Sequence, residues 1–329
     1  MSSIAVIIVN HNTREHLRAC LASVQQEALG EVIVIDNASS DGSVEMVQAY
    51  YPQVVLHASK ENIGYGAAAN LAVAFSTAKY VLLLNSDTLL QTGVLQALSI
   101  YLDRNPQAAV VGPRLVNPDG TLQASCHQTP GTLKWLFDNC TLSRLIRYIP
   151  VLRNYSLLTW SHNQARIVPW VLGAALAIRR EAFEAVGGFD ETFFMYFEET
   201  DICYRLNIEG WEVHFAPVAT IMHVGGASTM QNSTDMAIQF SVSIMKFFQK
   251  HYSGLRLAGL VKVTKSRVLL RLIRDIIRFQ ITRDACKRAR IDKDVAVWRD
   301  VLSGISREQG IHGSEHSTAV SNKGTGTLG

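Results

Sequence analysis

The sequence predicts an α/β fold: a doubly wound, mostly parallel sheet, with an amphipathic helical segment after it. Short aliphatic runs recur through the first 90 residues, and helical patterns separate them. Each run is continuous rather than alternating, which is typical of strands buried on both faces of a parallel sheet. A change of charge after residue 240 marks the helical segment as a separate part.

Four strands and three helices are expected in the first 90 residues, each ending at a polar or glycine-containing turn. The expected strands are Ile4–Val9, Val32–Ile35, Val54–His57 and Tyr80–Leu84. The expected helices are Arg14–Gln26, Val44–Tyr50 and Tyr65–Ser76, with Asn12 as the N-cap of the first. Ligands of doubly wound sheets bind beyond the carboxyl ends of the strands. We therefore expect Asn10, Asp36, the loop 60–66 and Asp87 to line one crevice.

The chain of 329 residues divides by composition into three parts. We expect a nucleotide-binding domain over 1–235, a basic amphipathic helical segment over 236–305, and a disordered polar tail over 306–329. Between Lys246 and Arg290 there are 13 Lys or Arg residues and 2 Asp or Glu residues, although the whole chain carries a net charge of only +3. Such polarity favours contact with a polyanionic surface.

Composition excludes several classes of protein. With 48% hydrophobic and 18% charged residues, the chain has enough apolar side chains for a large core and is not mostly disordered. The longest uncharged apolar stretch, Val168–Ile178, is too short to cross a bilayer. The five cysteines show no CxxC spacing, which argues against a zinc ribbon or a disulfide scaffold and favours a reducing cytoplasm.

Two carboxylates follow predicted strands. Asp36 either forms an Asx turn or accepts a hydrogen bond from a nucleobase or ribose, and the turn is the commoner role for a single strand-end Asp. Asp87 ends the sequence Asn85-Ser86-Asp87 after a buried strand. It either caps a turn or holds a divalent cation, which would neutralise a diphosphate.

Three further motifs are candidates for the site. Gly64 and Gly66 punctuate a loop that enters a helix, so backbone N–H groups could approach an anion there. Glu198, Glu199 and Asp201 lie in an unusually aromatic segment, and partial burial would raise a carboxyl pKa and favour a general base. His223 precedes two glycines and is by itself a weak signal.

Taken together and in order, these motifs resemble the inverting glycosyltransferases of family 2, which have the GT-A fold. The resemblance covers about residues 3–230. It is carried by VIIVNHN, VIVIDNASSDGS, ENIGYGAAAN, LLLNSDT, the segment from VLGAALAIRR to FEETDICYR, and HVGG. The FDE and FEETD block together with NSD resembles the rhamnosyltransferase-like branch, which builds bacterial surface polysaccharides, including the O-antigen of lipopolysaccharide.

The resemblance implies a role for each candidate residue. Asp87 and His223 would bind Mg²⁺ or Mn²⁺, with Asn85 replacing the first acid of the usual DxD-type motif. Glu199 would be the catalytic base, one methylene longer than the usual Asp, with Glu198 and Asp201 as fallbacks. The donor nucleotide would be bound by a set of residues along the strand ends: Val9, Asn10, Asp36, Asn62, Gly64, Asn70, Asn85 and Ser86.

The implied reaction moves a sugar, L-rhamnose in the first instance, from a dTDP- or UDP-linked donor to a glycan or polyprenyl-diphosphate-linked acceptor, with inversion. Another donor, such as UDP-galactofuranose or a UDP-hexose, is an alternative. A catalytically silent nucleotide-sugar-binding scaffold and a nucleotidyltransferase are further alternatives. The scaffold is disfavoured because base, cation carboxylate and histidine are all present, and the nucleotidyltransferase because no glycine-rich, basic activation loop opens the chain.

The basic segment has helical periodicity. Arg267, Arg271, Arg274 and Arg278 form one stripe, beside an apolar face expected to contain Leu269, Leu272, Ile273, Ile276 and Ile277. This pattern predicts either a helix in a membrane interface or a core-packing helix with a solvated arginine face. Nucleic acid is not expected, since no aromatic interleaving or known binding motif is present. Because relatives use lipid-linked acceptors, we expect peripheral attachment to the inner face of the cell membrane.

Overall fold

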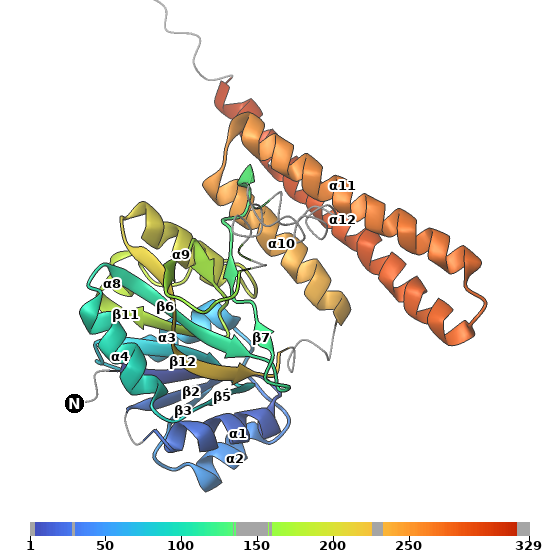
Figure 1. Ribbon diagram of the computed structural model, residues 1–329. Coiled ribbons are helices and arrows are strands. Elements are labelled where there is room, and N and C mark those ends of the chain that lie inside the picture. The colour runs from blue at the N-terminus through green and yellow to red at the C-terminus, as the bar shows by residue number, and fades with distance from the viewer. Residues whose placement is uncertain are drawn as a thin grey trace, which may run out of the picture. The chain divides into compact units, whose positions relative to one another are not determined.

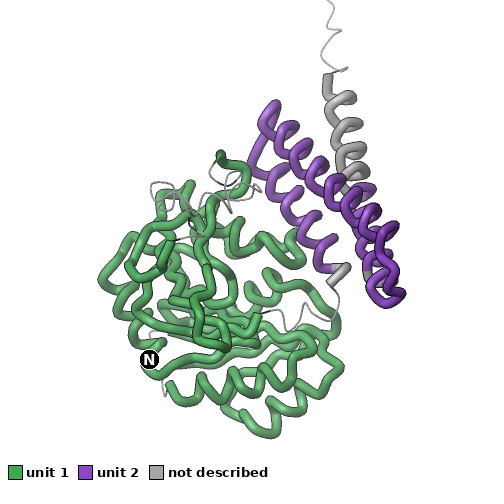
Figure 2. The backbone as a smooth tube through the Cα atoms, turned by 45° about the vertical axis from the view of Figure 1, so that its right-hand side comes forward, with its two compact units in different colours: residues 1–231 green, residues 232–329 purple. Residues whose placement is uncertain are grey.

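The computed structural model describes residues 4–27, 30–133, 135, 157, 160–225 and 233–320, with the side chains of 233–235, 290 and 304–320 left undescribed. The chain forms two compact units, Met1–Gln231 and Asn232–Gly329 (Figure 2). The first unit contains the sheet, and the described residues of the second form helices. The division lies close to the boundary expected at residue 235.

A mixed, mostly parallel sheet organises the first unit (Figure 1). Its main path runs in the order β3-β2-β1-β4-β11-β6-β12-β5. The neighbours β3, β2, β1 and β4 are all parallel, β11 lies antiparallel between β4 and β6, and β12 is parallel to β6. The strands of this path are β1 Ile4–Asn10, β2 Val32–Asp36, β3 Val55–Ala58, β4 Tyr80–Asn85, β5 Thr88–Leu90, β6 Ala108–Val116, β11 Ala175–Arg179 and β12 Glu212–His223.

Short strands and six helices complete the first unit as far as it is described. The strands are β7 Leu122–Gln123, β8 Cys126–His127, β9 Arg166–Ile167 and β10 Trp170–Val171. The helices are α1 Arg14–Gln25, α2 Ser43–Tyr50, α3 Tyr65–Ala74, α4 Val94–Arg104, α8 Arg180–Ala185 and α9 Glu198–Ile208. The predicted doubly wound sheet is confirmed, and the seven elements expected before residue 90 all lie within two residues of their predicted bounds.

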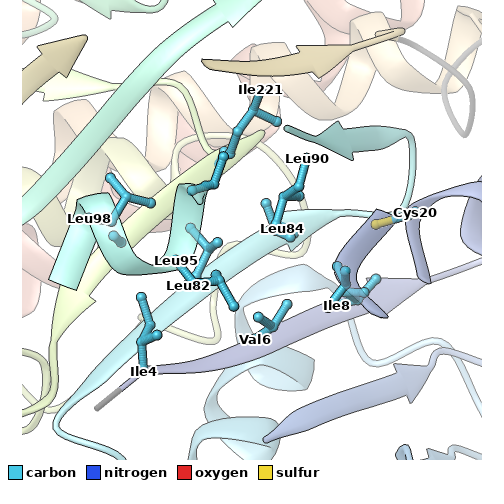
Figure 3. Packing of buried hydrophobic residues seen from close by; sticks show 14 of the residues in the cluster. Ile4, Val6, Ile8, Cys20, Leu82, Leu84, Leu90, Leu95, Leu98 and Ile221 are labelled. Atoms are coloured by element: carbon cyan, nitrogen blue, oxygen red, sulfur yellow. The ribbon is translucent and has the colours of Figure 1, made fainter. Parts of the chain in front are cut away.

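Alternate residues along the strands pack into two separate core layers, one on each face of the sheet. Val6 and Ile8 of β1 pack into one layer with α1 and α4, whereas Ile7 packs into the other with α3 and α9. Figure 3 shows the first layer, where Leu82 and Leu84 of β4 meet Ile8 and its neighbours. Because both faces are covered, the interior residues of β1, β2 and β4 are apolar, which explains the continuous aliphatic runs in the sequence.

The second unit consists of α10 Ser233–His251, α11 Gly254–Ile281 and α12 Ala285–Val320, with α11 packed along α12. The helix α12 continues to Val320, where the sequence predicts a disordered tail from residue 306; residues 321–329 lie outside the described part of the chain. Among the residues that can be described, no helix combines the length and apolarity needed to span a bilayer.

One local prediction is wrong. The N-cap of α1 is Thr13, not Asn12. Asn12 has a φ of 53°, and its side-chain oxygen accepts the backbone N–H of Ser40 at 2.8 Å. The amide therefore ties the turn after β1 to the loop after β2 instead of capping the helix, because Asn tolerates the left-handed region.

Candidate active site

The carboxyl ends of β1 and β2 are joined by a polar network. Asn10 donates from Nδ2 to Asp36 Oδ2 at 2.8 Å, and its Oδ1 accepts the Thr13 hydroxyl at 2.6 Å. The Thr13 and Ser86 hydroxyls lie 2.7 Å apart, so the network extends to the residue after β4. Asn10, Thr13, Asp36 and Ser86 are all buried, and Val9 pairs within the sheet with Ile35 and Asn85. The expected convergence of these strand ends is observed.

Asp36 makes a local bond to the loop that follows it. Its Oδ1 accepts the backbone N–H of Ser39, three residues on rather than the two of an Asx turn, at 2.8 Å, and its Oδ2 accepts from Asn10. A carboxylate has about four acceptor sites, so two filled sites leave room for a ligand N–H. These bonds therefore fix the carboxylate without excluding a contact with a base.

The loop before α3 is braced from within the protein. Asn37 donates to Asn62 Oδ1 at 2.8 Å and accepts the N–H of Ile63 at 3.0 Å. Asn62 Oδ1 also accepts the N–H of Gly64 at 3.1 Å. Asn62 is thus part of the scaffold of the loop, and Asn37 is a residue that the sequence reasoning missed.

Gly64 and Gly66 allow another segment of this chain to approach α3. Gly64 has a φ of +85°, and a Cβ there would lie 2.6 Å from the carbonyl oxygen of Phe194. That same carbonyl accepts the N–H of Tyr65 at 2.9 Å. A Cβ on Gly66 would lie 3.2 Å from the Phe189 side chain. The close approach expected for a ligand is therefore made by the segment that leads into α9.

Asp87 and His223 lie side by side. His223 Nε2 is 3.3 Å from Asp87 Oδ1, and both side chains are mostly buried. The sheet brings them together, because Thr88 of β5 is directly opposite His223 of β12 in an antiparallel pair. A backbone hydrogen bond from Val224 N to the Asp87 carbonyl, 3.0 Å long, holds the same pairing.

Gln123 orients the imidazole. Its Oε1 lies 2.7 Å from His223 Nδ1, and its Nε2 donates to Asn117 Oδ1 at 3.0 Å. Because the Gln123 oxygen can only accept, Nδ1 carries a proton, and Nε2 is the nitrogen that faces the Asp87 carboxylate. A proton or a cation between Nε2 and the carboxylate is favourable at this position.

The donor set fits a divalent cation. An imidazole nitrogen and a carboxylate oxygen are ordinary ligands for such ions, and the Gln123 contact is the outer-shell support that metal-binding histidines usually have. Within the ranges described, no group of three or more His, Cys, Asp or Glu residues could hold a metal ion. Any cation here would need further ligands, such as the oxygens of a bound diphosphate.

A strained turn presents the two glutamates. Tyr196 and Phe197 both have positive φ, 65° and 70°, directly before α9 begins at Glu198. Left-handed bulky residues are genuine outliers that persist only where surrounding structure fixes them, and they cluster at functional sites. The turn places Glu198 and Glu199 at the helix N-terminus.

Both glutamates are acids whose charged forms are disfavoured. Burial raises the pKa of Glu198 well above its usual value, and the charge of Glu199 raises it further. Burial also raises the pKa of Glu199, against the opposing effect of backbone N–H groups of Glu199, Thr200, Gly173 and Phe197. The Oε2 atom of each side chain is enclosed and has no hydrogen-bond partner in the described part of the protein. Enclosed carboxylate oxygens of raised pKa suit proton transfer.

Asp201 has a different environment from its two neighbours. It is fully buried, and its Oδ2 accepts from Arg205 Nε at 2.7 Å. Arg205 also donates to the carbonyls of Val186 and Gly188, so this ion pair ties α9 to the end of α8. Asp201 therefore serves as a structural anchor here, and its use as a fallback base stays a prediction.

Asn70 also has a bracing role. Its Nδ2 donates to the Phe189 carbonyl and to Glu191 Oε1, and its Oδ1 accepts the Phe189 N–H at 2.9 Å. The amide thus fixes the segment before α9 to α3. Its predicted contact with the nucleotide stays a prediction.

Gly173 and Ala174 connect the glutamates to the Asn85-Ser86-Asp87 sequence. A Cβ on Gly173 would lie 3.5 Å from Glu199 Cβ, and the neighbouring Ala174 carbonyl accepts the N–H of Asn85 at 3.0 Å. Ala175 then pairs with Leu84 in the sheet. Two motifs more than 100 residues apart in sequence therefore meet at one end of β4 and β11. No pattern in the sequence identifies Gly173 or Gln123 as part of the site.

The sequence matches a known protein family over more than half of its length. Residues 5–187 match the description "Glycosyl transferase family 2". The chain belongs to this family. This family 2 glycosyltransferase is 30% identical over 268 residues to an N-acetylglucosaminyl-diphospho-decaprenol L-rhamnosyltransferase of Mycobacterium tuberculosis, covering 76% of this chain and 85% of the relative. It is also 25% identical over 237 residues to the rhamnosyltransferase WbbL of Escherichia coli, covering 66% of this chain and 82% of the relative.

A solved structure shows the same architecture. The mannosyltransferase PcManGT of Pyrobaculum calidifontis, in complex with GDP-Man and Mn²⁺, matches with a TM-score of 0.53 at 16% identity. The match covers 93% of this chain and 84% of that one. At this identity the likeness concerns the fold alone, and the expected GT-A fold followed by C-terminal helices is confirmed.

Proposed function

We propose that this enzyme transfers L-rhamnose, with inversion, from a nucleoside-diphosphate sugar to a polyprenyl-diphosphate-linked acceptor in the synthesis of a bacterial surface polysaccharide. The names of the two rhamnosyltransferases support the sugar, and the name of the mycobacterial relative supports a lipid-linked acceptor. The main structural support is the Asp87–His223 pair, together with the contact of Gly173 with Glu199 and the bond of the neighbouring Ala174 to Asn85.

Glu199 is the proposed base. In the reaction, Glu199 takes the proton of an acceptor hydroxyl while that oxygen forms a bond to the anomeric carbon of the donor. The bond from that carbon to the diphosphate breaks, and the nucleoside diphosphate leaves with the electron pair. A raised pKa favours this role because the carboxylate then has a stronger affinity for the proton it removes. Glu198, beside it, limits the charge that the pair can carry together.

Asp87 and His223 are the proposed ligands of Mg²⁺ or Mn²⁺. When bound, such a cation would neutralise the charge that develops on the leaving diphosphate. Asp87 supplies the negative charge in this pair, because Asn85 stands where related motifs carry a second acid. Asp36, Asn10 and the loop 62–64 are the proposed seat of the pyrimidine nucleoside.

A donor panel tests this function. The full-length enzyme is incubated with a synthetic polyprenyl-diphospho-N-acetylglucosamine and, in turn, dTDP-L-rhamnose, UDP-galactofuranose and UDP-glucose, with product identified by mass spectrometry. Transfer of rhamnose with inverted anomeric configuration is the expected result. Transfer only from another donor would replace the sugar assignment, and full activity after thorough chelation with EDTA would remove the cation role of Asp87 and His223.

A further inference from the structure

The helix α11 carries an exposed apolar stripe on the side opposite its packed face. Its buried residues, Leu260, Val261, Val268, Leu272 and Asp275, recur on one side of the helix. Opposite them, Leu270 is 66% exposed, Ile273 44%, Ile277 54% and Ile281 72%. These four recur at intervals of three, four and four, so they form a single stripe along the helix surface. Leu272, expected in the apolar face from the sequence, is instead buried on the packed side.

Basic side chains lie along one edge of the stripe and on the turns before it. At about 100° per residue, Arg274 and Arg278 fall along that edge, and Lys262, Lys265 and Arg267 precede Leu270. The helix contains seven Lys or Arg residues and a single acid, Asp275. Asp275 is buried, bonded to Arg274 at 2.8 Å and to the Trp298 indole N–H at 3.1 Å. The exposed side of α11 therefore presents apolar and cationic groups without an anionic one.

We propose that this stripe lies in the interface of an anionic phospholipid bilayer, with its aliphatic side chains below the headgroups and the flanking Arg and Lys residues among the phosphates. The inference does not depend on the proposed reaction. An apolar band with long cationic side chains beside it and before it is complementary to a surface that is apolar inside and anionic outside. A second copy of this chain is a poor occupant, because the basic side chains of the two copies would then approach each other.

Charge complementarity also limits the class of lipid. Each Lys or Arg near an anionic membrane surface favours binding, whereas a zwitterionic surface offers little net attraction. Binding should therefore need both components: the stripe for insertion and anionic lipid for attraction. Each component can be removed separately.

Vesicle flotation of the full-length chain tests the proposal. The probes are vesicles of pure phosphatidylcholine and vesicles in which about a third of the lipid is phosphatidylglycerol, which supplies the anionic surface. The Ile273→Ser/Ile277→Ser variant should bind the anionic vesicles about tenfold more weakly or worse, since two exposed aliphatic side chains are lost. The matched control is Ile167→Ser/Ile208→Ser, which removes two equally exposed isoleucines from the first unit and should bind like the wild type.

The outcomes are distinct. Preferential binding of the wild type to anionic vesicles, weakened by salt and by the α11 variant alone, supports the proposal. Equal binding of the α11 variant and the wild type overturns it, and so does equal binding to both kinds of vesicle. A concentration-dependent dimer in light scattering that is lost in the α11 variant, without vesicle binding by the wild type, would assign the stripe to self-association instead. Circular dichroism and a thermal melt of each variant exclude unfolding as the cause.

Discussion

At the scale of single residues, the imidazole of His223 depends on a chain of amides for its orientation. Asn117 accepts from Gln123, and Gln123 accepts from His223. The Gln123 amide nitrogen donates to Asn117, so its oxygen is the atom that faces His223. The imidazole must then donate from Nδ1, and this orientation is fixed before any ligand binds. The hairpin between β6 and β7 thus controls a nitrogen that faces Asp87.

Replacing Gln123 should weaken cation binding. In the Gln123→Ala variant the imidazole loses its acceptor, and we expect the affinity for Mn²⁺ in the presence of dTDP to fall about tenfold or more. Electron paramagnetic resonance of free Mn²⁺ measures this directly, without enzyme turnover. The Gln123→Glu variant retains an acceptor for Nδ1–H and should recover most of the affinity. Equal Mn²⁺ affinity in the alanine variant and the wild type would contradict the positioning role.

The Glu199→Gln variant distinguishes the proposed role of Glu199 as the base from a role in donor binding. The amide cannot take a proton, so we expect the rate of transfer at saturating substrate to fall roughly 10²–10⁴-fold. The affinity for dTDP, measured by calorimetry, should stay within about twofold, because the variant alters the charge of one group and few contacts. A large loss of dTDP affinity would instead assign Glu199 to donor binding.

Glu198 should make the stability of the enzyme depend on pH. Its folded pKa lies above its unfolded value of about 4.3. The folded state therefore binds the proton more tightly, and the free energy of unfolding falls as pH rises through the folded pKa. Urea denaturation should find Glu198→Gln more stable than the wild type at pH 8 and no longer so at pH 4. Glu209→Gln, at the exposed end of α9, is the control; the same pH dependence in all three proteins would contradict the assignment.

At the scale of elements, the site depends on how closely the segment before α9 packs against the N-terminus of α3. Gly64 has φ and ψ of 85° and 165°, a conformation that is essentially restricted to glycine. The Phe194 carbonyl occupies the space where a side chain would begin. The contact ties the loop proposed to seat the nucleoside to the turn that presents the glutamates.

A pair of glycine variants measures this packing. Gly93 also begins a helix with a positive φ, 87°, but nothing lies within 4 Å of a Cβ built there. Gly93→Ala should cost about 1–2 kcal/mol of unfolding free energy through backbone strain alone. Gly64→Ala should cost about 1–3 kcal/mol more, because it adds a clash with backbone. Similar losses in urea denaturation for both variants would show that the close approach contributes little.

The elements before residue 90 could be predicted because their signals are local. Short continuous aliphatic runs such as Ile4–Val9, bounded by polar turns, indicate buried strands, and the rule for strand ends then brings Asn10 and Asp36 together. The Asp87–His223 pair could be anticipated only through the family resemblance, since it depends on the pairing of β5 with β12. Gln123 and Gly173 act through contacts distant in sequence, which no local pattern encodes.

At the scale of the whole molecule, the two compact units have separate tasks in our proposals: the first binds the donor and the second binds a bilayer. Ligand binding to one unit stabilises that unit by mass action and need not affect the other. The α11–α12 pair has its own interior contacts, including the Trp298 bond to Asp275 and the stacking of Arg271 on Trp298 at 5.1 Å.

Hydrogen exchange should separate the units. With Mn²⁺ present throughout and dTDP added at about 100 times its Kd, we expect the amides of residues 36–40, 62–66 and 85–88 to gain protection corresponding to about 2.7 kcal/mol at most. The amides of α11 should exchange as in the free enzyme. Protection confined to α11 and α12 would move the nucleotide site out of the first unit.

The pairing of β5 with β12 also has a consequence for synthesis of the chain. Asp87 emerges from the ribosome early, but its imidazole neighbour belongs to the last strand of the sheet. Domains generally fold as units during synthesis, and contacts distant in sequence form late. A nascent chain that ends before residue 223 holds four parallel strands and the proposed nucleoside site, yet it lacks one of the two proposed cation ligands. The enzyme would therefore become able to act only when its final strand is in place.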